Sequence, residues 1–114
     1  MHAVHATAAP GVRIDVRLPE GSPAQVVLGG ELDLSTIAPV REAVRALWAA
    51  GHGEVRLDLR ELTFMDSSGV HLIRDLQTTA ESTGRRLSVL EAEGPARRVL
   101  LLTGMRRHLP VESA

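Results

Sequence analysis

Two short stretches of this 114-residue sequence carry side chains that could do chemistry. The first is Gly30-Glu31-Leu32-Asp33, and the second covers residues 63–70 and includes Asp66-Ser67-Ser68. Asp and Ser often cap a helix, because their oxygens accept hydrogen bonds from the first free backbone N–H groups. Capping uses only one of these three residues, which leaves a serine hydroxyl over. The start of a helix favours a negatively charged phosphate group, because its free N–H groups and the helix dipole attract negative charge. Capping alone explains most such clusters, but here the second stretch leaves a spare serine hydroxyl at a position that favours a phosphate.

Other chemistries fit these residues less well. A hydrolase would need Ser67 as nucleophile, His71 as base and Asp66 as the orienting acid, but the spacing is wrong and no G-x-S-x-G turn is present. The histidines, at positions 2, 5, 52, 71 and 108, are too scattered for a metal site. The sequence has no glycine-rich phosphate-binding loop, so nothing in it indicates a nucleotide cofactor. We therefore expect a protein that is not an enzyme and that needs no metal or cofactor.

Composition narrows the class of protein further. The chain has 13 basic residues, all of them Arg, against 14 acidic ones, for a formal net charge of −1. A near-neutral charge argues against binding to nucleic acid or a membrane surface. Cysteine is absent, and the chain has neither an apolar run of about 20 residues nor a signal-peptide-like start. These features predict one cytoplasmic domain.

The spacing of apolar residues predicts alternating strands and helices. Residues 12–18 alternate between apolar and charged side chains, and residues 54–59 do so strictly. Glycine and proline divide the rest of the chain into segments. We expect a loose tail over 1–11, strands at 12–18, 25–32, 54–59, 86–90 and 109–111, and helices that begin near 36, 68 and 95 and end before Gly51, Gly84 and Gly104.

This order of elements predicts an α/β fold in two layers. Strands joined through helices run parallel and connect by right-handed crossovers. Because the strands alternate charged with apolar residues, one face of the sheet should stay open to water. We therefore expect a mixed sheet of four to five strands with its helices packed on one face. Both chemical stretches then leave the sheet at the same edge, so Asp33 and Asp66 become neighbours.

With these motifs the sequence resembles the anti-sigma factor antagonist family, the bacterial STAS domain. The resemblance covers residues 12–111 and rests on Gly30-Glu31-Leu32-Asp33, on Leu59 with 64–69, and on the run 99–105. It implies that the unmodified protein binds an anti-sigma factor, a serine kinase of the histidine-kinase-like ATPase fold, and so frees a sigma factor during stress or sporulation. It also implies that this kinase phosphorylates Ser67 and that a serine phosphatase reverses the reaction.

The resemblance and the expected topology together define a predicted site. Ser67 is its phosphoacceptor, and Ser68 is expected to cap the helix. At position 71 relatives often have a small residue, whereas this chain has His71. The partner-binding residues are expected to be Glu31, Asp33, Met65, Asp66, Ser67, Ser68, Gly69 and His71.

Two further expectations accompany this site. Many relatives carry another helix after the last strand, whereas this sequence stops at Ser113-Ala114. An apolar strip on the sheet or on the third helix is therefore expected to be less covered and to favour a weak homodimer. The alternative function is a STAS scaffold that is never phosphorylated and serves a signalling or transport complex.

Overall fold

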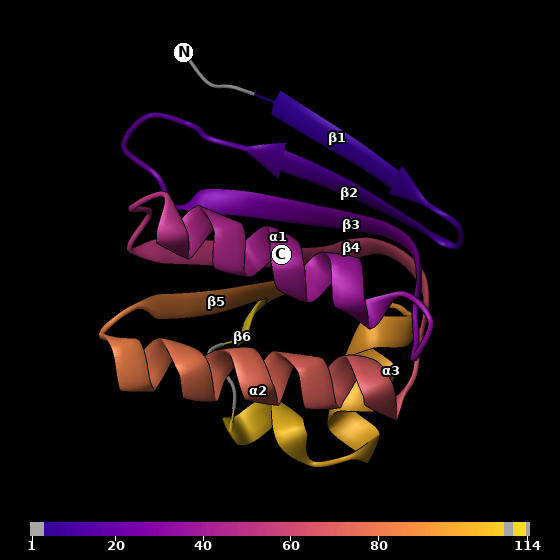
Figure 1. The fold of residues 1–114 in the computed structure, drawn as a ribbon. Helices are drawn as coiled ribbons and strands as arrows, with labels where there is room; N and C mark the ends of the chain where they lie inside the picture. The colour runs from indigo at the N-terminus through magenta and orange to yellow at the C-terminus, as the bar shows by residue number, and fades with distance from the viewer. Residues whose placement is uncertain (1–3, 109–110, 114) are drawn as a thin grey trace.

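The computed structural model describes residues 4–108 and 111–113, which form two layers, a sheet and a set of helices packed on it (Figure 1). The elements follow the alternation of apolar residues and glycines along the chain. In order they are β1 (Val4–Ala9), β2 (Val12–Arg17), β3 (Ala24–Leu32), α1 (Ile37–Ala49), β4 (Glu54–Met65), α2 (Ser67–Thr83), β5 (Arg86–Glu91), α3 (Pro95–Leu102), the 3-10 helix η1 (Met105–His108) and β6 (Val111–Ser113).

The strands lie side by side in the order of the sequence, from β1 to β6. β1, β2 and β3 are antiparallel neighbours, whereas β3, β4, β5 and β6 run parallel. Each parallel pair is joined through a helix, and successive right-handed crossovers in one direction bring the helices to the same face. The predicted two-layer α/β class with a mixed sheet is confirmed (Figure 1).

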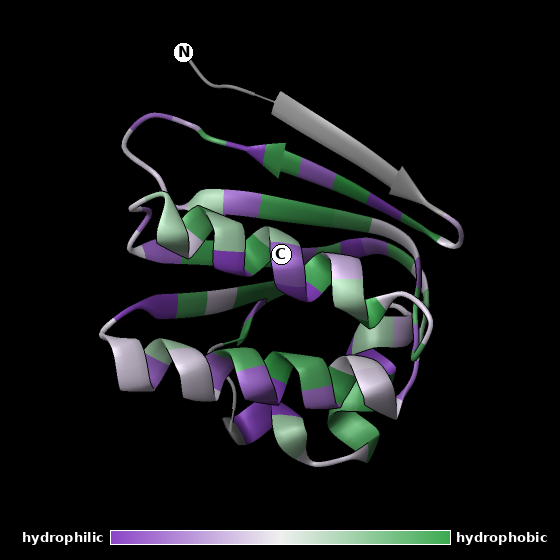
Figure 2. Cartoon of the chain, in the orientation of Figure 1, coloured by the Kyte–Doolittle hydropathy of each residue, from purple (hydrophilic) through white to green (hydrophobic). Residues whose placement is uncertain are grey.

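The two faces of the sheet differ in polarity. Ile14, Leu28 and Leu57 point into the core beneath the helices and are buried. Their neighbours in sequence point to the other face, where Arg13 pairs with Asp15 and Glu61. Apolar and polar bands alternate along β2 in Figure 2, as the sequence predicted.

The N-terminal segment differs from its prediction. Residues 1–11 were expected to be a loose tail, but Val4–Ala9 forms β1, an edge strand paired with β2. Pro10 and Gly11 make the turn between them, and Gly11 has a φ of 89°, a conformation that glycine adopts readily. Backbone hydrogen bonds form this pair, and the alternation of Val4, Ala6 and Ala8 is a weak strand pattern because two of these three apolar residues are alanine. The described residues hold six strands, one more than expected.

Two other boundaries shift. β4 was expected to end at Leu59 but continues to Met65, because β3 and β4 stay paired through two irregularities in register. The last strand was expected at 109–111; β6 lies at Val111–Ser113, and residues 109 and 110 fall outside the described part.

The helices give two further results. Leu101 and Leu102 on α3 are exposed, and the less covered apolar strip and the weak homodimer stay predictions. Among the described residues, no helix has the length and apolar character to cross a membrane.

Candidate functional site

The two stretches singled out in the sequence meet at one edge of the sheet. β3 and β4 run parallel, with Glu31 opposite Phe64 and Leu32 opposite Met65. Just beyond the strands, the Asp66 N–H donates a hydrogen bond of 3.3 Å to the Leu32 carbonyl. The predicted adjacency of the two stretches is therefore confirmed.

Asp66 forms the start of α2. Its backbone is extended, with φ −119° and ψ −169°, and its carboxylate accepts a hydrogen bond of 2.9 Å from the Ser68 N–H. The Gly69 N–H donates to the Asp66 carbonyl at 3.1 Å. The assignment of the cap to Ser68 was wrong, because a cap must precede the helix in an extended conformation and Ser68 is already helical.

The side chains that follow Asp66 divide into exposed and buried ones. Ser67, the first residue of α2, is exposed, and Ser68 is half-buried. Met65 and Gly69 are buried beneath them. A Cβ on Gly69 would lie 2.6 Å from Met65 Cγ, so only glycine lets α2 start this close to the end of β4. Met65 and Gly69 thus support the site from below and do not line its surface.

The turn after β3 is held by a compact set of hydrogen bonds. The Asp33 carboxylate accepts from the Ser35 N–H at 2.9 Å and from the Ser35 hydroxyl at 2.6 Å. The buried Thr36 hydroxyl accepts from the Asp33 N–H at 2.9 Å and donates to the Glu31 carbonyl at 2.8 Å. Hydrogen bonds from Ser35, the hydroxyl first, hold the pKa of Asp33 below its ordinary value, so Asp33 is ionised at neutral pH.

The rim of the site carries an uncompensated negative charge. No ion pair within the described residues engages Glu31, Asp33 or Asp66. The nearby Arg13 is paired with Asp15 and Glu61 on the open face of the sheet. We call this set of three carboxylates the acidic rim. An added phosphate at Ser67 would enter a region that is already negative.

Sequence reasoning missed the apolar part of the site. Leu34, in the turn before α1, is 77% exposed, and Phe64, near the end of β4, is 46% exposed. The sequence did offer one indication of this surface, the apolar Leu34 between the polar residues Asp33 and Ser35. A large apolar side chain in such a turn stays exposed to water, and exposed apolar side chains that gather in one place can mark a binding surface. His71 is exposed on α2, which fits a surface position.

The site offers no built metal centre. Among residues 4–108 and 111–113, no group of three or more His, Asp or Glu side chains is arranged to hold an ion. What the edge does offer is an exposed hydroxyl at the first position of a helix, three carboxylates and two exposed apolar side chains. Such a surface is suited to binding another protein.

The fold is that of a small two-layer α/β domain. A family model described as "Mlab, STAS domain" matches residues 19–111, and the chain therefore belongs to the STAS domain family. No curated protein matches the sequence. The resemblance that the motifs indicated is thus confirmed for the family.

Solved structures agree with this assignment. An anti-sigma factor antagonist from Mycobacterium paratuberculosis is 25% identical, with a TM-score of 0.74 over 92% of this chain and 89% of that one. The unphosphorylated form of the anti-sigma factor antagonist SpoIIAA is 22% identical, with a TM-score of 0.72 over 89% of this chain and 87% of that one. The phosphorylated form of SpoIIAA, a Bacillus cell fate determinant, is 22% identical, with a TM-score of 0.66 over 89% and 90%. At 22% identity, the two SpoIIAA structures show that this chain shares their fold.

Proposed function

We propose that this chain is a cytoplasmic anti-sigma factor antagonist controlled at Ser67. The unphosphorylated form binds an anti-sigma factor that is a serine kinase, and this binding releases the sigma factor. The kinase then phosphorylates Ser67, which abolishes binding, and a serine phosphatase restores it. The observation that carries the proposal is the exposed Ser67 at the first position of α2, next to the acidic rim. The similarity to the mycobacterial antagonist supports the partner class.

The residues around Ser67 divide into two roles in this proposal. Glu31, Asp33, Asp66, Ser68 and His71 form, with Ser67, the surface that meets the anti-sigma factor. The buried Met65 and Gly69 fix where that surface lies.

The physics of the switch follows from charge. A phosphate adds about −1.5 to −2 charges and three acceptor oxygens at pH 7. At the start of a helix this charge is stabilised by the helix dipole, so α2 is not expected to unfold. At the interface, in contrast, a buried unpaired charge costs about 3–5 kcal/mol. That corresponds to roughly a hundred- to several thousandfold loss of affinity.

A second candidate function is a STAS scaffold that binds its partner without ever being phosphorylated. The description of the matching family model, which names Mlab and no antagonist, favours keeping it. A scaffold has no need for an exposed hydroxyl at the start of α2, and for that reason we rank it second.

The test compares Ser67→Ala with the wild type. Each is incubated with ATP and the candidate anti-sigma kinase of the source organism, and phosphorylation is read by intact mass. Wild type should gain one phosphate, Ser67→Ala none, and the control Ser82→Ala, at an exposed serine of α2, one. Modification of Ser67→Ala to the same extent would disprove the site. Complex formation without any modification of the wild type would support the scaffold instead.

Binding gives the second readout. Ser67→Ala should hold the kinase at least as tightly as the wild type does, because the complex cannot be ended by phosphorylation. Ser67→Asp should bind more weakly, although aspartate carries less charge than a phosphate and its effect is partial. Equal affinity of phosphorylated and unphosphorylated wild type would contradict the proposed switch.

A further inference from the structure

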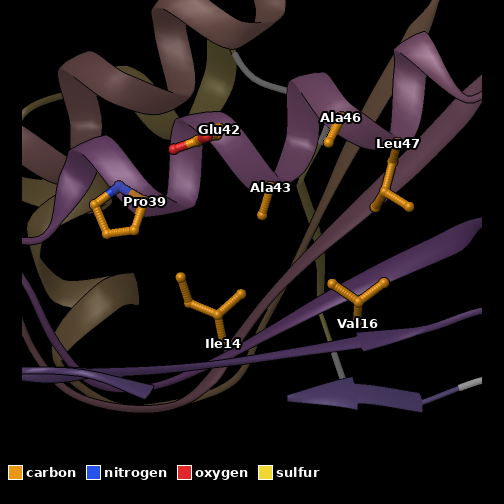
Figure 3. A pocket seen from close by; sticks show the side chains of 7 residues that line it. All are labelled: Ile14, Val16, Pro39, Glu42, Ala43, Ala46 and Leu47. Carbon is orange, nitrogen blue, oxygen red and sulfur yellow. The ribbon is translucent and has the colours of Figure 1, made fainter. Parts of the chain in front are cut away.

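An apolar groove runs along α1 on the side away from α2 (Figure 3). It has a volume of about 460 Å³. Ile14 and Val16 point into it from β2. The opposite wall is α1, which contributes Pro39, Ala43, Ala46 and Leu47, with Glu42 as the single charged lining residue.

The groove follows from the topology of the sheet. α1 connects β3 to β4 and packs on these two strands. β2 is the next strand outward, so its apolar face extends beyond the helix. Ala43 and Ala46 stand where larger side chains could have covered Val16, which stays half-exposed. Apolar surface left open beside a candidate site can take part in binding a protein.

The groove begins at the functional site. Pro39, in the first turn of α1, lies at one end of it (Figure 3). The turn directly before α1 contains Asp33 of the acidic rim and the exposed Leu34. Gly11, in the turn before β2, accepts a hydrogen bond from the Glu31 N–H at 2.7 Å, which ties the start of β2 to the rim as well. A partner seated on the rim can therefore reach the groove along α1.

The charged side chains that line the groove and the acidic rim are all carboxylates, whereas the exposed Arg45 lies beside Glu42 and Ala46 in a second hollow on α1. Within the described residues, Glu42 has no ion-pair partner, as is the case for the acidic rim. The adjacent Arg41 reaches the other way, to Asp75 of α2 at 3.6 Å. A partner segment that is apolar and places a basic side chain at Glu42 complements the groove, because like charges placed opposite each other oppose association.

We propose that the groove between α1 and β2 is a second part of the docking surface for the anti-sigma factor. It takes an apolar segment of that protein which carries a Lys or Arg next to Glu42. This inference rests on the proposed function, because it names where the same partner binds. It adds a contact that phosphorylation of Ser67 does not touch, so the groove sets affinity while Ser67 sets the switch.

Two groove variants with matched controls test the proposal. Glu42→Lys reverses the charge, and Ala46→Trp fills the groove from an exposed position of α1. Glu81→Lys and Ser82→Trp make the same changes at exposed positions near the end of α2. Affinity for the anti-sigma kinase that binds wild type is measured by calorimetry in the full-length chain. Circular dichroism and thermal unfolding establish that each variant is folded.

The expected result is a loss of affinity of about tenfold or more for each groove variant and wild-type affinity for both controls. Phosphorylation of Ser67 should still occur at saturating kinase, which separates the groove from the switch. Wild-type affinity of both groove variants would overturn the groove while leaving the proposed function intact. A wild type that is dimeric, with both groove variants monomeric, would also overturn it and assign the groove to a second copy. Failure of wild type itself to bind any anti-sigma kinase would overturn the proposed function and this inference together.

Discussion

Asp66 determines where α2 begins and, through this, where the Ser67 hydroxyl is presented. Its carboxylate accepts the Ser68 N–H, one of the free donors at the helix start. Asp66→Ala should therefore lower the free energy of unfolding by about 0.5–2 kcal/mol, whereas Asp66→Asn, also a good cap, should keep most of it. Urea unfolding at pH 7 measures both variants. Equal losses for Ala and Asn would show that the charge matters and the cap does not.

Gly69 is required by packing and not by backbone conformation. A Cβ there would lie 2.6 Å from Met65 Cγ and 3.1 Å from Leu32 Cδ2, both in the core. Gly69→Ala should therefore destabilise the fold by about 1–3 kcal/mol, because buried atoms must move apart. Gly53→Ala is the control, since a Cβ on Gly53 meets no atom within 4 Å. A stability for Gly69→Ala equal to that of Gly53→Ala would contradict the packing argument.

Asp58 makes stability depend on pH. Burial by itself raises the pKa of this carboxyl, but hydrogen bonds from the Arg60 side chain and backbone outweigh burial and bring the pKa below its ordinary value of 3.8. A lowered pKa stabilises the fold above pH 3.8, and this contribution is lost as the pH falls through the folded-state pKa. The melting temperature should therefore fall less steeply between pH 6 and pH 3 in Asp58→Asn than in wild type.

A second carboxylate supplies the comparison for this pH series. Asp75→Asn removes a half-exposed carboxylate whose ion pair with Arg41 is longer, at 3.6 Å. This variant is the control for removing one carboxylate as such. Identical slopes for wild type and Asp58→Asn would refute the assignment.

At the scale of elements, one buried carboxylate fastens the C-terminal segments to the sheet. Glu91, fully buried at the end of β5, accepts hydrogen bonds from Arg97 of α3 at 3.1 Å and Arg106 of η1 at 2.6 Å. Hydrogen bonds to charged groups contribute about 1.5–3 kcal/mol each. Glu91→Gln should therefore speed amide hydrogen exchange in α3 and η1 while leaving α2 unchanged. Glu93→Gln, at an exposed position, should leave exchange in α3 and η1 as it is in wild type. If Glu91→Gln protected α2, α3 and η1 as well as wild type does, this role of Glu91 would be disproved.

The elements also show what the sequence could predict. β2 and every helix ended by a glycine were found close to their predicted bounds, and β4 begins at its predicted residue but ends later. β1 escaped prediction because its alternating apolar residues, Val4, Ala6 and Ala8, are mostly alanine and give a weak strand pattern; backbone pairing with β2 holds the strand. The second half of β4 escaped because the irregular pairing with β3 breaks the alternation, so that the buried Leu59, Leu62 and Met65 lie three residues apart.

At the scale of the whole molecule, the site exists because consecutive parallel strands end at the same edge. That rule brought Asp33 and Asp66 into adjacent segments from sequence alone. It did not predict which oxygen caps α2 or that Leu34 would be exposed, because both depend on local backbone angles. The groove along α1 could not be predicted from the sequence either. It depends on the distance between α1 and β2, a strand that α1 does not cover.

The last prediction concerns how phosphorylation acts on the molecule as a whole. A negative charge at the first position of α2 should stabilise the helix by about 0.3–1 kcal/mol, so modified protein should unfold at the same or a higher temperature. Ser67→Asp and Ser67→Asn differ in charge at nearly equal size, and the difference between their melting temperatures isolates the charge. The Asp variant should be the more stable of the two, by a margin that shrinks at high salt. A lower stability of Ser67→Asp or of phosphorylated wild type would mean that the switch acts by unfolding α2 and not by blocking a docking surface.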